Sequence, residues 1–146
     1  MKKSLLIGLM ISCLYSCAQS HDIAGDYEKI SKDGSVEYLL ELRANGTFLF
    51  DSYTIRQVEG KSIQIKGGMT TEPSIRGRGR WRAENDMVHF ETDRNTDIDH
   101  NYPLNLHGTR AKYRGASDEK AIAEVEFVES EVFWITGIEL VRKNPE

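Results

Sequence analysis

The sequence has only two cysteines, Cys13 and Cys17, and both lie close to the amino terminus. The rest of the chain therefore offers no thiol for a disulfide, a thiolate metal site or a cysteine nucleophile. After Cys17 no stretch is apolar for long enough to form a membrane-spanning helix. The formal net charge is −4, which makes nucleic acid a poor partner.

Motifs for chemistry are absent as well. We find no Ser-His-Asp arrangement, no phosphate-binding glycine loop, no nucleotide fingerprint and no zinc spacing among the four histidines. Acidic residues alternate in 93–100, but Ile98 and Leu104 stand where a calcium loop needs glycine and glutamate. The sequence predicts a protein that is not an enzyme and holds no metal or cofactor.

The amino terminus is typical of an exported precursor. Lys2 and Lys3 precede an apolar segment, residues 4–14, that is too short to cross a bilayer as a stable helix. The motif Leu14-Tyr15-Ser16-Cys17 resembles the lipobox of bacterial lipoproteins, which implies cleavage before Cys17 and acylation of that residue. The same motif ending at Cys13 is the competing site, but it shortens the apolar segment.

We therefore expect a lipoprotein signal peptide in residues 1–16 and a lipidated cysteine with its tether in residues 17–22. Ala18 follows the cysteine, and an alanine rather than an aspartate there resembles lipoproteins that are sent to the outer membrane. The expected location is the cell envelope, with the protein held on the membrane by its lipid.

Residues 23–143 show the period-two alternation of β-strands. Two hairpins are predicted, one around Asn45-Gly46 and one around 84–86. Further strands are expected at 62–66, 104–113, 121–129 and 132–142. About eight or nine short strands with regular turns favour an all-β fold, a single small up-and-down antiparallel β-barrel without exposed edges.

Short motifs along this region carry a resemblance to a known group. They are Gly25-Asp26-Tyr27, Asn45-Gly46-Thr47-Phe48, Gly79-Arg80-Trp81 and the closing Glu139-Leu140-Val141-Arg142. With them, residues 23–143 resemble the small lipocalin-like lipoproteins of Gram-negative bacteria, which implies a lipocalin-like barrel. Tyr27 stands where the lipocalin signature has tryptophan. The Cys-x-x-Cys pair of a copper-responsive member is missing, so a copper role is not implied.

Four arginines occupy alternate positions and share one face of a predicted strand. One interpretation is a solvated outer face whose arginines pair with Glu124 and Glu126 of another strand. The other is a contact surface for an anion or a partner protein, because the guanidinium fork binds carboxylate or phosphate. The four residues are Arg76, Arg78, Arg80 and Arg82.

The opposite face of that strand carries Gly77 and Gly79 beside Trp81. Glycine within a strand indicates a bend or a close approach of another backbone. Alternatively, the glycines leave room for a small apolar ligand, because an eight-stranded barrel can hold one. The residues expected to line such a site are Trp81, Phe48, Phe50, Tyr38 and Phe90.

Two functional hypotheses follow. The first is a non-enzymatic, membrane-anchored envelope lipoprotein that binds a small apolar or amphipathic ligand inside its barrel. The second is a protein-interaction module, such as an inhibitor or an envelope assembly factor, that acts through loops or the arginine-lined strand.

Overall fold

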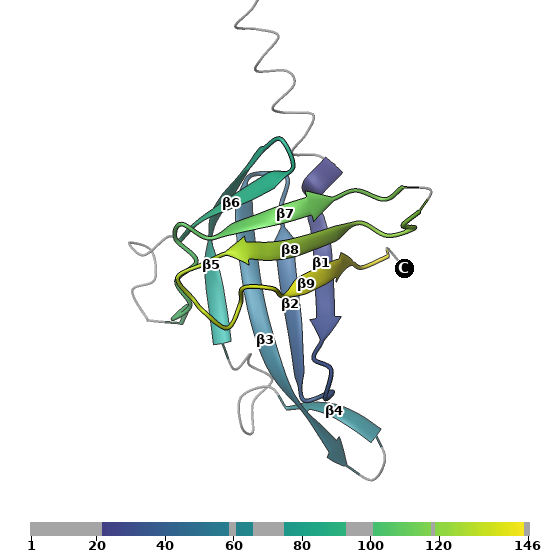
Figure 1. Cartoon of the computed structure of the whole chain (residues 1–146). Helices are drawn as coiled ribbons and strands as arrows, with labels where there is room; N and C mark the ends of the chain where they lie inside the picture. The colour runs from purple at the N-terminus through teal and green to yellow at the C-terminus, as the bar shows by residue number, and fades with distance from the viewer. Residues whose placement is uncertain (1–21, 59–60, 66–74, 93–100, 118, 145–146) are drawn as a thin grey trace, which may run out of the picture.

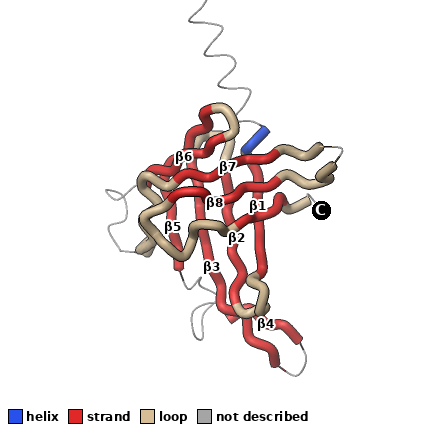
Figure 2. The backbone as a smooth tube through the Cα atoms, viewed as in Figure 1, coloured by secondary structure: helices blue, strands red, loops and turns tan. Residues whose placement is uncertain are grey.

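The computed structural model describes residues 22–58, 61–65, 75–92, 101–117 and 119–144. Within these ranges the chain is built of strands and loops, with a single helical turn at residues 22–23 (Figures 1 and 2). The strands are β1 (Gly25–Ile30), β2 (Val36–Leu42), β3 (Thr47–Val58), β4 (Lys61–Ile65), β5 (Ile75–Glu84), β6 (Met87–Thr92), β7 (Arg110–Arg114), β8 (Glu124–Glu129) and β9 (Glu139–Arg142).

The strands close into a barrel. Eight of them pair antiparallel in the order β1, β2, β3, β5, β6, β7, β8, β9, and β9 pairs with β1. The ninth, β4, pairs with the far end of β3. That hairpin projects from one end of the barrel, while the helical turn at residues 22–23 lies at the other (Figure 1). The expected all-β, up-and-down barrel is confirmed.

Both predicted hairpins are confirmed. The turn between β2 and β3 is closed by Arg43, whose backbone nitrogen donates to the Thr47 carbonyl at 2.9 Å. Gly46 supplies the positive φ of 81° that this turn requires, and Asn45 accepts from the Thr47 nitrogen. At the second turn, Asn85 takes the left-handed conformation with φ 57°.

Three expected strands are shorter than the alternation predicted. In place of 104–113 the strand is Arg110–Arg114, of 121–129 only Glu124–Glu129 is strand, and of 132–142 only Glu139–Arg142. Several apolar residues of the lost parts still belong to the core, since Leu104, Leu106 and Ile135 are buried there. They lie in loops that close the barrel, and a loop that buries alternate side chains has the same pattern as a strand.

The inward-facing side chains form one hydrophobic core between β1–β3 and the strands β7–β9 that cross in front of them (Figure 1). Most intervening positions of the barrel strands are polar, which is the alternation expected of a barrel wall. The buried residues of the eight barrel strands include Tyr27, Leu40, Leu42, Phe48, Phe50, Trp81, Val88, Phe90, Ala111, Val125, Phe127 and Leu140.

The first and last strands are joined by a cluster of polar contacts at the amino-terminal turn. Arg142 donates through Nη2 to the carbonyl oxygens of Asp22 and Ala24, at 2.6 and 2.7 Å, and lies over the Tyr27 ring. The Tyr27 hydroxyl donates to the Ile23 carbonyl at 2.6 Å. These bonds satisfy carbonyls of the turn and fix the point where the amino-terminal segment meets the barrel.

Gly77 and Gly79 mark close approaches, as glycine within a strand indicates. A Cβ on Gly79 would overlap the backbone carbonyl of Glu91 on the neighbouring strand β6. A Cβ on Gly77 would lie 3.2 Å from both the side chain and the backbone carbonyl oxygen of Leu104, which occupy the space beside this glycine. The space at both glycines is therefore occupied by the protein itself.

We expect Gly79→Ala to lower the free energy of unfolding by about 3 kcal/mol or more, since backbone must move to admit the methyl group. Gly77→Ala is the matched control, because its Cβ would lie 3.2 Å from Leu104 instead of overlapping a carbonyl oxygen, and we expect a loss of about 1 kcal/mol. Urea unfolding measures both. Equal losses for the two variants would contradict the close approach at Gly79.

Burial raises the pKa of Tyr27 from 10.0 to about 12, although the nearby Arg142 guanidinium opposes the shift. The unfolded chain therefore loses this proton at lower pH than the folded chain, and stability should fall as the pH rises from 10 to about 12. We expect Tyr27→Phe to flatten this fall in urea unfolding at alkaline pH. Tyr113→Phe, which removes a neighbouring hydroxyl that is a smaller cause of the same shift, should reduce the fall only in part.

Candidate functional site

The five aromatic residues predicted to surround a ligand lie together inside the barrel. Phe48, Phe50, Trp81 and Phe90 are buried, and Tyr38 is half-buried against the same core. Phe48 and Phe90 meet edge to face with ring centroids 5.1 Å apart, and Tyr38 lies 6.3 Å from Phe50. The alternation along the strands was sufficient to place these residues on one surface.

Two further rings fill the space between them. Phe127 lies 6.1 Å from Phe50 and 5.5 Å from Phe90. Trp134, which belongs to the loop before β9, stacks on Tyr38 at 6.3 Å and lies 6.4 Å from Phe50. Such separations are those of rings in direct contact. The interior around Phe50 is thus occupied by the protein's own side chains, and Trp134 was missed because its segment was assigned to a strand.

The four arginines lie on the outer face of β5, as the alternation predicted, but they do not form one uniform stripe. Arg76 pairs with the buried Asp51 of β3, with Nε 3.1 Å from Oδ1. The Tyr102 ring lies under both Arg76 and Arg78, 4.9 and 4.2 Å from their guanidinium carbons. Arg82 pairs with Glu84 on its own strand.

The proposed pairing of the arginines with Glu124 and Glu126 is wrong. Strand β8, which carries both glutamates, lies between β7 and β9 and is not a neighbour of β5. Glu124 pairs with Lys120, and Glu126 pairs with Arg114. The order of strands around the barrel decides these partners, and it cannot be read from the alternation within a strand.

Arg80 faces a hollow of about 500 Å³ on the outer surface of β5 and β6. It is exposed and has no ion-pair partner within 4.0 Å among the described residues. His89 and Glu91 of β6 border the hollow on one side, and Thr47 borders it on the other. This is the part of the arginine-lined strand that is open to a partner.

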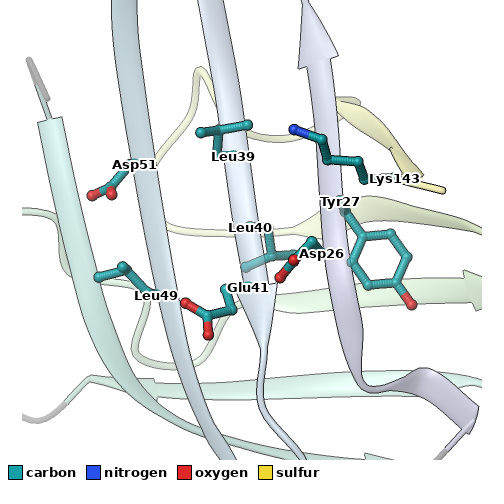
Figure 3. A pocket seen from close by; sticks show the side chains of 8 residues that line it. All are labelled: Asp26, Tyr27, Leu39, Leu40, Glu41, Leu49, Asp51 and Lys143. Carbon is teal, nitrogen blue, oxygen red and sulfur yellow. The ribbon is translucent and has the colours of Figure 1, made fainter. Parts of the chain in front are cut away.

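A second hollow, of about 370 Å³, lies on the outer surface of β1, β2 and β3 (Figure 3). Its floor includes Leu39 and Leu49, whose side chains are on the outside of the barrel wall yet half-buried. Three carboxylates and one ammonium group line the remainder, and they belong to Asp26, Glu41, Asp51 and Lys143.

Acidic residues surround Leu39 on four sides. Glu28 and Asp51 face it from the two neighbouring strands, and Glu37 and Glu41 flank it along β2. The sequence reasoning missed this site. The available signal was an apolar residue at an outward position of two strands, Leu39 between two glutamates and Leu49 beside Asp51. Only the register of β2 on β3 shows that the two leucines are neighbours.

Most carboxylates of this surface are held by cations at its margin. Glu41 accepts two hydrogen bonds from Arg43, at 2.7 and 2.9 Å, and these bonds lower the pKa of Glu41. Glu28 lies 3.5 Å from Lys143. Asp26 is exposed and has no ion-pair partner among the residues that the structure describes. The cations at the margin therefore hold the carboxylates of Glu28 and Glu41 in place.

The described part of the chain contains no group of three or more metal-binding side chains. Within it, no helix is long and apolar enough to cross a membrane. His89 is half-buried on the outer face, with Nε2 3.7 Å from Glu84. Cys17, most of its tether and the acidic segment 93–100 lie outside the described residues.

Comparison with protein-family models, with curated proteins and with solved structures found no match. The barrel that the lipocalin-like resemblance implied is present. Membership of that group of lipoproteins stays a prediction, because it depends only on the short motifs of the sequence.

Proposed function

We propose that this protein is a membrane-anchored envelope lipoprotein that acts as a protein-interaction module and not as an enzyme. The observation that carries the proposal is the filled interior. An eight-stranded barrel either encloses a ligand or fills its interior with side chains. Here Phe50 contacts Tyr38, Phe127 and Trp134, which leaves the outer surface and the loops as the places for recognition.

The position of the amino-terminal turn supports an anchored module. If Cys17 carries the lipid, the five residues 18–22 can span at most about 17 Å. The turn at residues 22–23 is at one end of the barrel and the β3–β4 hairpin is at the other (Figure 1). The turn end then faces the membrane, and the outer wall and the hairpin remain accessible to an envelope protein.

The hollow beside Arg80 is the contact surface that this proposal favours. Arg80 is free of a described ion-pair partner and Arg82 is exposed beside it. Guanidinium groups on a rigid strand suit a carboxylate of a partner, because the strand fixes their direction and the fork donates two parallel hydrogen bonds. The proposed partner therefore presents acidic side chains to this hollow.

We expect crosslinking in native membranes to capture a protein on the wild-type chain and markedly less of it on Arg80→Glu combined with Arg82→Glu. Lys32→Glu, an exposed charge in the turn between β1 and β2, is the control and should not change the yield. Cys17→Ser should lose acyl label and leave the membrane fraction. A wild-type chain that captures no protein, or a yield that charge reversal does not alter, would contradict the proposal.

Binding of a small apolar ligand is the second candidate, and the position of Trp134 favours it. This residue lies in the loop before β9, where it is half-buried, stacks on the half-buried Tyr38 of β2 and covers Phe50. A ligand that displaced Trp134 would reach the ring cluster. In this alternative the loop before β9 acts as the entrance, and Tyr38, Phe48, Phe50, Trp81 and Phe90 line the site.

A hydrophobic fluorescent dye distinguishes the two candidates. If the protein is an interaction module, we expect no rise in dye fluorescence with the wild-type protein, because the rings fill the interior. Trp134→Ala opens a cavity and should give a clear rise. Phe133→Ala is the control, since Phe133 is 86% exposed in the same loop. Strong dye binding by the wild-type protein, abolished by a filling substitution such as Leu104→Phe, would favour the ligand candidate.

A further inference from the structure

We infer that the leucine-floored hollow over β1–β3 is a second docking site, and that it takes an extended segment of a partner protein with an aliphatic side chain between two cationic ones. The inference deepens the proposed function and rests on it. Three features of the hollow favour such a segment. They are its apolar floor, the charge around that floor and the fixed positions of the carboxylates.

The two leucines at the floor of the hollow favour an apolar side chain in the partner. Leu39 and Leu49 are on adjacent strands, and their cross-strand partners are Asp51 and Glu41, so the leucines are diagonal neighbours. Both are on the outside of the barrel, where the alternation places polar residues, and both line the same hollow. An apolar centre inside a polar rim is the arrangement of protein–protein contact sites.

The carboxylates at the rim of the hollow favour a positively charged partner. Five carboxylates surround the leucines, from Asp26, Glu28, Glu37, Glu41 and Asp51. The cations nearest to them are Arg43, Arg76 and Lys143, which pair with Glu41, Asp51 and Glu28, and Arg78, which lies opposite Leu49. Among the described residues Asp26 has no ion-pair partner, so its exposed carboxylate at the rim attracts a cationic segment and repels anionic lipid or nucleic acid.

The geometry favours an extended segment over a folded domain. The hollow has about 370 Å³, which is at the lower end of ligand sites and has room for few side chains. Arg43 and Arg76 hold the carboxylates of Glu41 and Asp51 in place. A partner therefore meets charges that are already oriented, which reduces the entropy lost on binding.

Three labelled peptides test the inference by fluorescence anisotropy with the full protein in a nonionic detergent. They are Lys-Leu-Lys-Leu-Lys, Lys-Ser-Lys-Ser-Lys, which lacks the anchor, and Glu-Leu-Glu-Leu-Glu, which has the wrong charge. We expect Lys-Leu-Lys-Leu-Lys to bind about tenfold more tightly than the other two peptides. Added salt should lower its affinity. Equal binding of the leucine and serine peptides would overturn the inference.

The variants locate the binding. We expect Leu39→Ser combined with Leu49→Ser to lower the affinity for Lys-Leu-Lys-Leu-Lys about tenfold. Asp26→Lys should also lower this affinity, and it should make the affinity less dependent on salt. Val128→Ser combined with Val141→Ser is the matched control, because these outward valines of β8 and β9 are 41% and 38% exposed. An equal loss with the valine pair would place binding elsewhere and overturn the inference. If no peptide binds but membrane crosslinking persists, this inference fails and the proposed function stands.

Discussion

The pairing of β1 with β9 is the constraint on which the rest of the structure depends. Tyr27 lies opposite Arg142 in this pairing, and the Arg142 guanidinium covers the Tyr27 ring while it binds two carbonyls of the amino-terminal turn. Closure leaves no open edge among the eight barrel strands. It also gives every strand an inside and an outside, so that alternate residues become either core or surface.

A cluster of aromatic rings fills the inside of the barrel around Phe50. Phe50 alone contacts three other rings, and Trp134 enters from a loop to complete the cluster. Leu104 occupies the space beside Gly77, and the β6 backbone at Glu91 leaves no room for a side chain on Gly79. A packed interior of this kind provides stability and a rigid wall. Under the proposed function, the outer surface of that wall binds the partner.

The wall carries two hollows of different chemistry on either side of β3. Leu49 lies opposite Arg78 at the border between them. The hollow over β5 and β6 is lined by Arg80 and Arg82. The hollow over β1–β3 has Leu39 at its floor and carboxylates around it. Because both hollows belong to paired strands, their side chains are held at fixed separations. Under the proposed function, the two surfaces would bind partners of opposite charge, or two segments of one partner.

The strand alternation, both hairpins, five of the aromatic residues of the core and the common face of the four arginines follow from the sequence alone. These features depend only on residues that are close along the chain, through the period-two alternation of strands and the residue types that form turns. Only the tertiary structure decided that Leu104 and Trp134 close the core from loops, that Glu126 pairs with Arg114, and that Leu39 and Leu49 share a hollow. These features depend on which strands become neighbours and in what register, and closure of the barrel fixes both.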